Sequence, residues 1–183
     1  CVRACAAGFC APGAPPDGDC PPGVPPTPAD GPPWWLPPIN NCDYDMAGDM
    51  LSFLLGGAAL KPRQPALASH LLAFPQADYV ATNLSNAAMD ETGFVYAPPE
   101  CRDDVAGCHV HVHYHPCGGS LRQVGLSYML ENALPAYAES NDMVVLYPQS
   151  GSVRNPSGAG CFDWYGAVGP DFDTRAGVQL NAV

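Results

Sequence analysis

The chain has 183 residues, of which 47% are hydrophobic, and a formal net charge of -11. This length and composition indicate a globular protein with one domain as the default. Its 18 acidic side chains against 7 basic ones repel phosphate backbones and anionic lipid, so we expect no nucleic acid and no membrane among its partners.

Nine cysteines are a high count for a chain of this length. Thiols stay reduced in the cytosol, so this count predicts a secreted, extracellular protein with disulfides. The chain begins at Cys1 without a charged and apolar leader, and we expect that a signal peptide or longer upstream region has been removed. The odd number leaves one cysteine for a free thiol, an interchain bond or an upstream partner.

Residues 1–41 form the first predicted unit, a Cys/Pro-rich extended arm. Proline fixes φ and removes a backbone donor, which favours polyproline II over helix or central strand. The arm is either a surface linker held by local disulfides or a partner-binding, crosslinked arm anchored by Trp34 and Trp35. The sequence leaves open the pairing of Cys1, Cys5, Cys10, Cys20 and Cys42.

Residues 42–183 form the second unit, where the pattern becomes that of an α/β domain. A helix is predicted from Asp43 to the glycine pair at 56–57, with one apolar face made of Met46, Met50, Phe53 and Leu54. Four strand candidates follow, at residues 71–74, 93–97, 108–115 and 143–147.

The segment between the last two strand candidates reads as two short helices within residues 121–140, with Pro135 in the first turn of the second. The shared apolar face contains Leu126, Leu130, Leu134 and Tyr137. A strand, helix, strand order implies a right-handed crossover, so we predict a mainly parallel sheet. The last residues, AGVQLNAV, look like the start of a further helix.

Two loops carry the candidate chemistry. One is the His115-Pro116-Cys117-Gly118-Gly119-Ser120 sequence after a strand, and the other is the Gly160-Cys161-Phe162-Asp163-Trp164 sequence. In α/β-hydrolases, a backbone N–H in a loop of the first kind helps to bind the oxyanion of acyl transfer. The Cys117 N–H is therefore the candidate oxyanion-hole donor.

Several motifs occur in one order: INNCDYDMAG, DETGFVYAPPEC, CHVHVHYHPCGGS, AYAESNDMVVLYPQS, GCFDWYG and GVQLNAV. Over roughly residues 39–183 they resemble secreted poly(3-hydroxybutyrate) (PHB) depolymerases, particularly the circularly permuted fungal type, and related feruloyl-type esterases. The resemblance implies a partial α/β-hydrolase-like domain, matching the C-terminal half of that family.

The resemblance also implies site residues. Cys117 falls at the oxyanion-hole amide and would be bonded to Cys161, and Cys101 and Cys108 would form a second disulfide. Phe162 and Trp164 occupy the aromatic wall of the substrate crevice, although both rings could instead be core residues.

The chain departs from the family pattern at the catalytic centre. Pro116 stands where the family has Gly, which restricts φ just before the donor. There is no G-x-S-x-G motif, and the nearest serine, Ser127, falls in a predicted helix. In permuted relatives the triad precedes the matched region, so we expect no catalytic triad in this chain and no activity from it alone.

The alternating histidines and one asparagine each have a functional and a structural interpretation. His109, His111, His113 and His115 alternate, so a strand would place them on one face, either as metal ligands or as structural hydrogen-bonding groups. Asn83-Leu84-Ser85 is an N-glycosylation sequon, with an unmodified loop asparagine as the alternative. No motif implies a cofactor.

Two functions fit these observations. The first is the oxyanion and substrate side of an extracellular carboxylic ester hydrolase that acts on a neutral or hydrophobic ester or polyester, with the triad supplied upstream. The second is a non-catalytic secreted structural or binding protein, in which a degenerate esterase fold self-associates or crosslinks through its arm.

Overall fold

The computed structural model describes residues 44–151 and 160–183. The predicted arm, with its tryptophans and cysteines, lies outside the described residues, as does Cys42. The boundary between residues 41 and 42 therefore stays a prediction. None of the helices in the described part of the chain is both long enough and apolar enough to cross a membrane.

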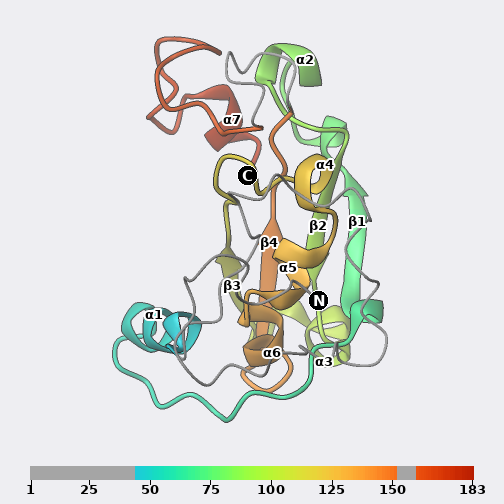
Figure 1. Cartoon of the computed structure of the whole chain (residues 1–183), viewed down its shortest axis with the longest axis vertical. Helices are drawn as coiled ribbons and strands as arrows, with labels where there is room; N and C mark the ends of the chain where they lie inside the picture. The colour runs from blue at the N-terminus through green and yellow to red at the C-terminus, as the bar shows by residue number, and fades with distance from the viewer. Residues whose placement is uncertain (1–43, 152–159) are drawn as a thin grey trace, which may run out of the picture.

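The described residues form an α/β structure around one four-stranded sheet (Figure 1). Its strands are β1 (Leu71–Pro75), β2 (Thr92–Tyr96), β3 (His109–Val112) and β4 (Met143–Tyr147), arranged in the order β1-β2-β4-β3. All four predicted strands are present. The third is shorter than expected, because β3 ends at Val112 and the chain then leaves the sheet toward the turn at Pro116.

The prediction of a mainly parallel sheet is wrong for the described strands. Only β3 and β4 are parallel, as the crossover between them requires, whereas β1–β2 and β2–β4 are antiparallel. The chain between β1 and β2 contains only a 3-10 turn (Gln76–Asp78) and the short α2 (Leu84–Ala87). It turns back along β1 without a helical crossover, and strands joined in this way pair antiparallel.

Three short helices, α4 (Leu121–Val124), α5 (Ser127–Glu131) and α6 (Leu134–Ala138), connect β3 to β4 and lie in front of the sheet in Figure 1. Pro135 is in the first turn of α6, as predicted, where its missing N–H costs nothing. The predicted apolar face packs on the sheet, in a core that includes Leu130, Leu134, Tyr137, Tyr96, Val145 and Tyr147.

Helix α1 (Met46–Leu54) forms where predicted but presents a different face. Met46, Phe53 and Leu54 are 63%, 81% and 58% exposed, and the buried residues are Ala47, Gly48 and Leu51. Small residues let the helix approach α6 closely. A Cβ at Gly48 would collide with the Tyr137 ring, whose hydroxyl donates to the Asp45 carboxylate at 2.6 Å. The strongly apolar face of α1 is therefore turned outward.

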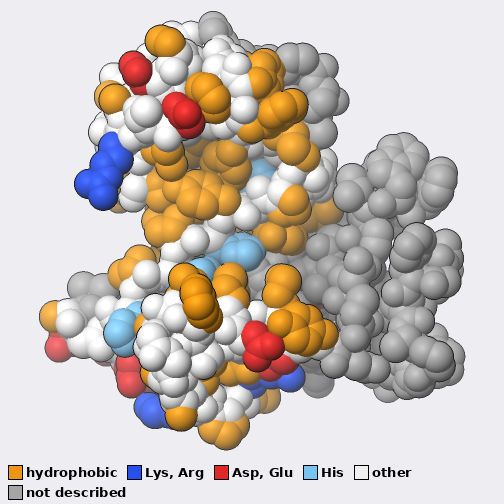
Figure 2. All heavy atoms as spheres, turned by 90° about the vertical axis from the view of Figure 1, so that its left-hand side faces the viewer, with side chains coloured by type: hydrophobic (Ala, Val, Ile, Leu, Met, Phe, Trp, Pro, Cys, Tyr) orange, Lys and Arg blue, Asp and Glu red, His pale blue; other side chains and the backbone are white. Residues whose placement is uncertain are grey.

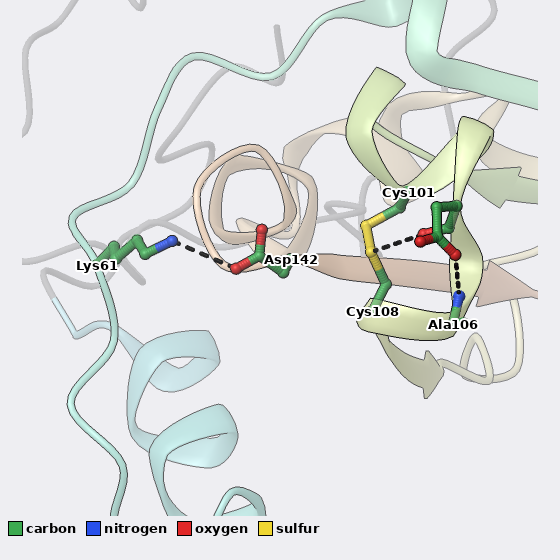
Figure 3. The surroundings of a disulfide bond; sticks show 6 residues. Lys61, Cys101, Ala106, Cys108 and Asp142 are labelled. Atoms are coloured by element: carbon green, nitrogen blue, oxygen red, sulfur yellow. Dashed lines mark hydrogen bonds and ion pairs between the residues drawn. A yellow bond between two sulfur atoms is a disulfide. The ribbon is translucent and has the colours of Figure 1, made fainter.

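The Cys101–Cys108 disulfide closes the loop between β2 and β3 (Figure 3). It links α3 (Pro99–Asp103) to the start of β3, and Cys101 packs with Ala97 and Val144 in a small core of its own. Figure 3 also shows the exposed Lys61–Asp142 ion pair on a neighbouring segment, at 3.3 Å. Exposed pairs of this kind contribute little, so the disulfide is the main constraint here.

Helices α2 and α7 (Val178–Asn181) lie together at the other end of the molecule (Figure 1). The buried Gln179 connects them, because its side-chain amide donates to the Ala87 carbonyl at 2.9 Å. The same side chain accepts from the Asp163 N–H at 2.8 Å. Gln179 thus joins α2, α7 and the loop around Asp163, and the predicted C-terminal helix is confirmed.

A buried glutamine pair fixes the end of β4 next to α4. The Gln149 side chain is 1% exposed and accepts from the Leu121 N–H at 2.8 Å, and the Gln149 N–H donates to Gln76 Oε1 at 2.9 Å. Replacing Gln149 with Leu would leave the partly buried Leu121 N–H without its acceptor. We expect a loss of about 1–3 kcal/mol in the free energy of unfolding, measured with urea. The exposed Gln64, changed to Leu, is the matched control, and equal losses would contradict the assignment.

Candidate active site

Residues 115–120 after β3 make a tight turn around Cys117. The Gly119 N–H donates to the Pro116 carbonyl at 2.9 Å, and Gly118 has a φ of +79°. This is the pattern of a type II turn, in which only glycine adopts the third position without strain. Cys117 is exposed, and its N–H donates to no acceptor in the described residues. The turn therefore offers a free N–H at the position predicted for the oxyanion donor.

His115, the first residue of this loop, is anchored to Ser150, in the segment that follows β4. Its ring is 4% exposed, Nδ1 lies 2.9 Å from the Pro116 carbonyl oxygen, and Nε2 accepts from the Ser150 N–H at 3.1 Å. These contacts require a proton on Nδ1 and none on Nε2. Burial lowers the pKa of His115, although the Pro116 carbonyl and Asp90 favour the charged form. His115 is therefore neutral and structural near pH 7.

A second connection ties the loop to the aromatic segment that follows residue 160. Cys117 is disulfide-bonded to Cys161, so both cystine pairings implied by the resemblance are present. Next to the disulfide, the Phe162 ring packs against Tyr114 and His115, with ring centroids 5.0 and 4.8 Å apart. The candidate oxyanion loop, residues 115–120, and the aromatic segment, residues 161–168, thus form one unit held by a covalent bond and by ring packing.

Phe162 and Trp164 have different surroundings. Phe162 is partly buried and packs on the small core of Val80, Ala87 and Met89. Trp164 is 70% exposed, and its ring lies 5.1 Å from the ring of Tyr165, which is 44% exposed. Trp164 is thus accessible to a ligand, whereas Phe162 mainly packs the segment against the core.

The four histidines of this region lie in different surroundings. His109 is exposed, and the rings of His111 and His113 are 5.9 Å apart. His113 Nε2 lies 2.9 Å from the Tyr128 hydroxyl. In residues 44–151 and 160–183, no group of three or more His, Cys, Asp or Glu side chains could hold a metal ion.

Two other predicted positions have clear surroundings. Ser127 is the first residue of α5 and is 7% exposed, so its hydroxyl is poorly placed to act as a nucleophile. Asn83 is exposed and caps α2 by accepting from the Asn86 N–H at 2.8 Å. A glycan on Asn83 stays a prediction.

Sequence reasoning missed three residues of this site. Ser150 anchors His115, Asp163 organises the loop that carries Trp164, and Gln179 anchors Asp163. Only Asp163 carries a local signal, an acid three residues before a glycine, which is common in turns stabilised by the acid's own side chain. The other two act across long sequence separations.

The candidate oxyanion loop follows β3, which is an edge strand of the sheet among the described strands. Figure 2 views the molecule from the side on which β3 and α1 lie in Figure 1, and it shows histidine side chains in a hollow between two larger masses. The hollow is bordered by many hydrophobic side chains and few charged ones. An apolar ligand would therefore meet a compatible surface here.

The described α/β structure, with its four-stranded mixed sheet, is similar to part of a PHB depolymerase. The chain is homologous to the PHB depolymerases over about 80% of its length. It is 32% identical over 160 residues to the polyhydroxybutyrate depolymerase of Talaromyces funiculosus and 28% identical over 148 residues to the poly(3-hydroxybutyrate) depolymerase of Delftia acidovorans. No family model matches the chain.

The solved structures that are similar to this chain are also PHB depolymerases. The crystal structure of PHB depolymerase from Penicillium funiculosum has 31% sequence identity and a TM-score of 0.67, covering 79% of this chain and 47% of that one. A PHB depolymerase complexed with an R3HB trimer has 31% identity and a TM-score of 0.70, with the same coverage. The chain spans less than half the length of these relatives, covering 45% of the Talaromyces protein and 28% of the Delftia protein.

Proposed function

We propose that this chain is the oxyanion and substrate side of an extracellular serine esterase that cleaves a hydrophobic polyester of the 3-hydroxybutyrate type. The observation that carries the proposal is the free N–H of Cys117, on a turn pinned to the aromatic segment by the Cys117–Cys161 bond. In acyl transfer, a serine attacks the ester carbonyl, a histidine takes the proton, and a preorganised N–H stabilises the oxyanion.

In this proposal the nucleophile comes from outside the described residues. The backbone N–H groups of His109 and His113 donate to residues of the chain along β4. Because backbone N–H groups alternate in direction along a strand, those of Val110 and Val112 point away from β4, toward the other edge of β3. Among the described strands none pairs with this edge of β3. A further strand of a longer protein could therefore add at this edge and bring the triad beside Cys117. The relatives, which are more than twice as long as the matched segment, are consistent with this arrangement.

The proposed substrate follows from the surface and from one relative. The related enzyme was solved with an R3HB trimer, a short polyester. The net charge of -11 disfavours anionic ligands, and the exposed Trp164 offers an apolar face to methyl-bearing ester units. Two disulfides in the described residues support the proposal of secretion.

Binding of a 3-hydroxybutyrate trimer, followed by NMR on the full chain, tests the substrate assignment. We expect saturable binding that the Trp164→Ala variant weakens about tenfold or more, because the change removes a large apolar contact. The matched control is Tyr44→Ala, another exposed aromatic residue, which lies just before α1 and distant from α7 (Figure 1). Trimer binding that is absent, or equally reduced by both changes, would contradict the assignment.

A second candidate function is structural. The outward face of α1, with Met46, Phe53 and Leu54 exposed, is an apolar surface of the kind that marks assembly sites. The same fold would then pair with other copies and would not cleave an ester. A sedimentation experiment distinguishes the two functions: self-association that Phe53→Ser abolishes favours the structural role, and a monomer at all concentrations argues against it.

A further inference from the structure

One carboxylate in the aromatic segment makes an unusual number of backbone contacts. Asp163 Oδ1 accepts from the N–H groups of Tyr165, Gly166 and Ala167 at 3.1, 3.0 and 3.0 Å, and its Oδ2 accepts from the Val168 N–H at 2.9 Å. Four consecutive amides therefore converge on one side chain. Gly166 has a φ of +89°, which allows the chain to curl around the carboxylate.

The start of this segment is also fixed to the rest of the fold. The Asp163 N–H donates to the buried Gln179, whose amide bonds the Ala87 carbonyl, and the preceding Cys161 is bonded to Cys117. The carboxylate is thus fixed relative to the oxyanion loop. What it organises is the chain that carries Trp164 and Tyr165, two large aromatic residues that are exposed to solvent.

We propose that Asp163 is the positioning residue of the substrate-facing aromatic segment, holding residues 164–168 in one conformation so that Trp164 meets the ester chain already in place. The inference rests on the proposed function for the identity of the ligand. An exposed ring on a loose loop would lose conformational freedom on binding, at about 0.5–1.5 kcal/mol for each immobilised side chain, and a preorganised ring avoids that loss.

The charge state of Asp163 fits this role. Partial burial opposes ionisation, but the four backbone donors outweigh it and lower the pKa of Asp163. No other ionisable side chain contributes to that shift, and the group that packs on it from α7, Gln179, is uncharged. The order that Asp163 imposes is therefore present at neutral pH and is lost only as pH falls through a value below 3.8.

Trp164 itself can report the effect. The chain has 3 tryptophans, so a background with Trp34→Phe and Trp35→Phe leaves Trp164 as the sole tryptophan, which is excited selectively at wavelengths that tyrosine does not absorb. In this background we expect the fluorescence anisotropy of Trp164 to fall from Asp163 to Asp163→Asn to Asp163→Ala. Asn keeps one oxygen for three donors but turns an amide toward Val168, and Ala removes both acceptors. The exposed Asp173, changed to Asn, is the control, because its carboxylate accepts no hydrogen bond from the described residues.

Binding of a 3-hydroxybutyrate trimer to the same variants completes the test. We expect up to about tenfold weaker binding by Asp163→Ala, in the same order as the anisotropy, with far-UV circular dichroism unchanged. Unchanged Trp164 anisotropy in Asp163→Ala overturns the proposal, as does reduced anisotropy with unaltered trimer affinity. Reduced anisotropy in a protein that binds no trimer in any form overturns the proposed function and leaves Asp163 as the organiser of the loop.

Discussion

Replacing both Cys117 and Cys161 with Ala is expected to lower the free energy of unfolding by about 4 kcal/mol, against about 2.5 kcal/mol for the pair Cys101 and Cys108. The two bonds close loops of different length, with sequence separations of 44 and 7. In the chain-entropy account, a longer loop restricts the unfolded chain more. Urea denaturation of the two double variants under the same oxidising conditions measures the difference.

The Cys101 and Cys108 pair is the matched control, since both double variants replace one buried and one more exposed cysteine. A second consequence concerns the site. Only the loss of the Cys117–Cys161 bond separates the oxyanion loop from the aromatic segment, so only that variant should also weaken trimer binding. Equal stability losses, or trimer binding reduced by both variants, would contradict this account.

Acid is expected to destabilise the fold well above the pH at which ordinary carboxylates titrate. Burial, with smaller contributions from His111 and His115, lowers the pKa of His113 to about 4. Burial also lowers the pKa of His111. Because the unfolded histidine takes up a proton near pH 6.5, the stability that neutral His113 contributes is full above that value and is lost as pH falls toward about 4.

Between pH 7 and pH 5, the free energy of unfolding is expected to fall by about 1–2 kcal/mol because of His113. The His113→Gln variant keeps a polar partner for the Tyr128 hydroxyl but does not titrate, so its stability should fall less over this range. His109→Gln, at the exposed first residue of β3, is the matched control. Urea midpoints at pH 7, 6 and 5 measure the slopes, and identical slopes for His113→Gln and the parent protein would show that His113 is not the group responsible.

Local patterns in the sequence predict the positions of most elements. The continuous apolar run at 143–147 gives β4 within its observed bounds, and the proline at 135 places α6 correctly. The direction of the strands could not be predicted in the same way. It depends on how the chain turns between β1 and β2, and the residues there carry no signal that distinguishes a reversal from a crossover. The outward face of α1 was also unpredictable, since the close approach of Gly48 to Tyr137 is a long-range packing choice.

The same division holds for the site. Cys117, Cys161 and Trp164 stand out through their motifs, and the structure brings the two cysteines together. The supporting contacts come from Ser150, which lies 35 residues from His115, and from Gln179, which lies 16 residues from Asp163 and 92 from Ala87. A hydrogen bond between such distant groups follows from the tertiary fold alone, so the supporting residues could not be predicted from local sequence.

The central claim is that this chain supplies the oxyanion and substrate side of a serine esterase whose nucleophile lies outside the described residues. Labelling the native, disulfide-bonded protein with a fluorophosphonate probe and mapping the modified peptide tests it most directly. We predict an adduct on a serine in a G-x-S-x-G sequence beyond these 183 residues. No adduct on the native material, or an adduct on Ser127, would contradict the claim.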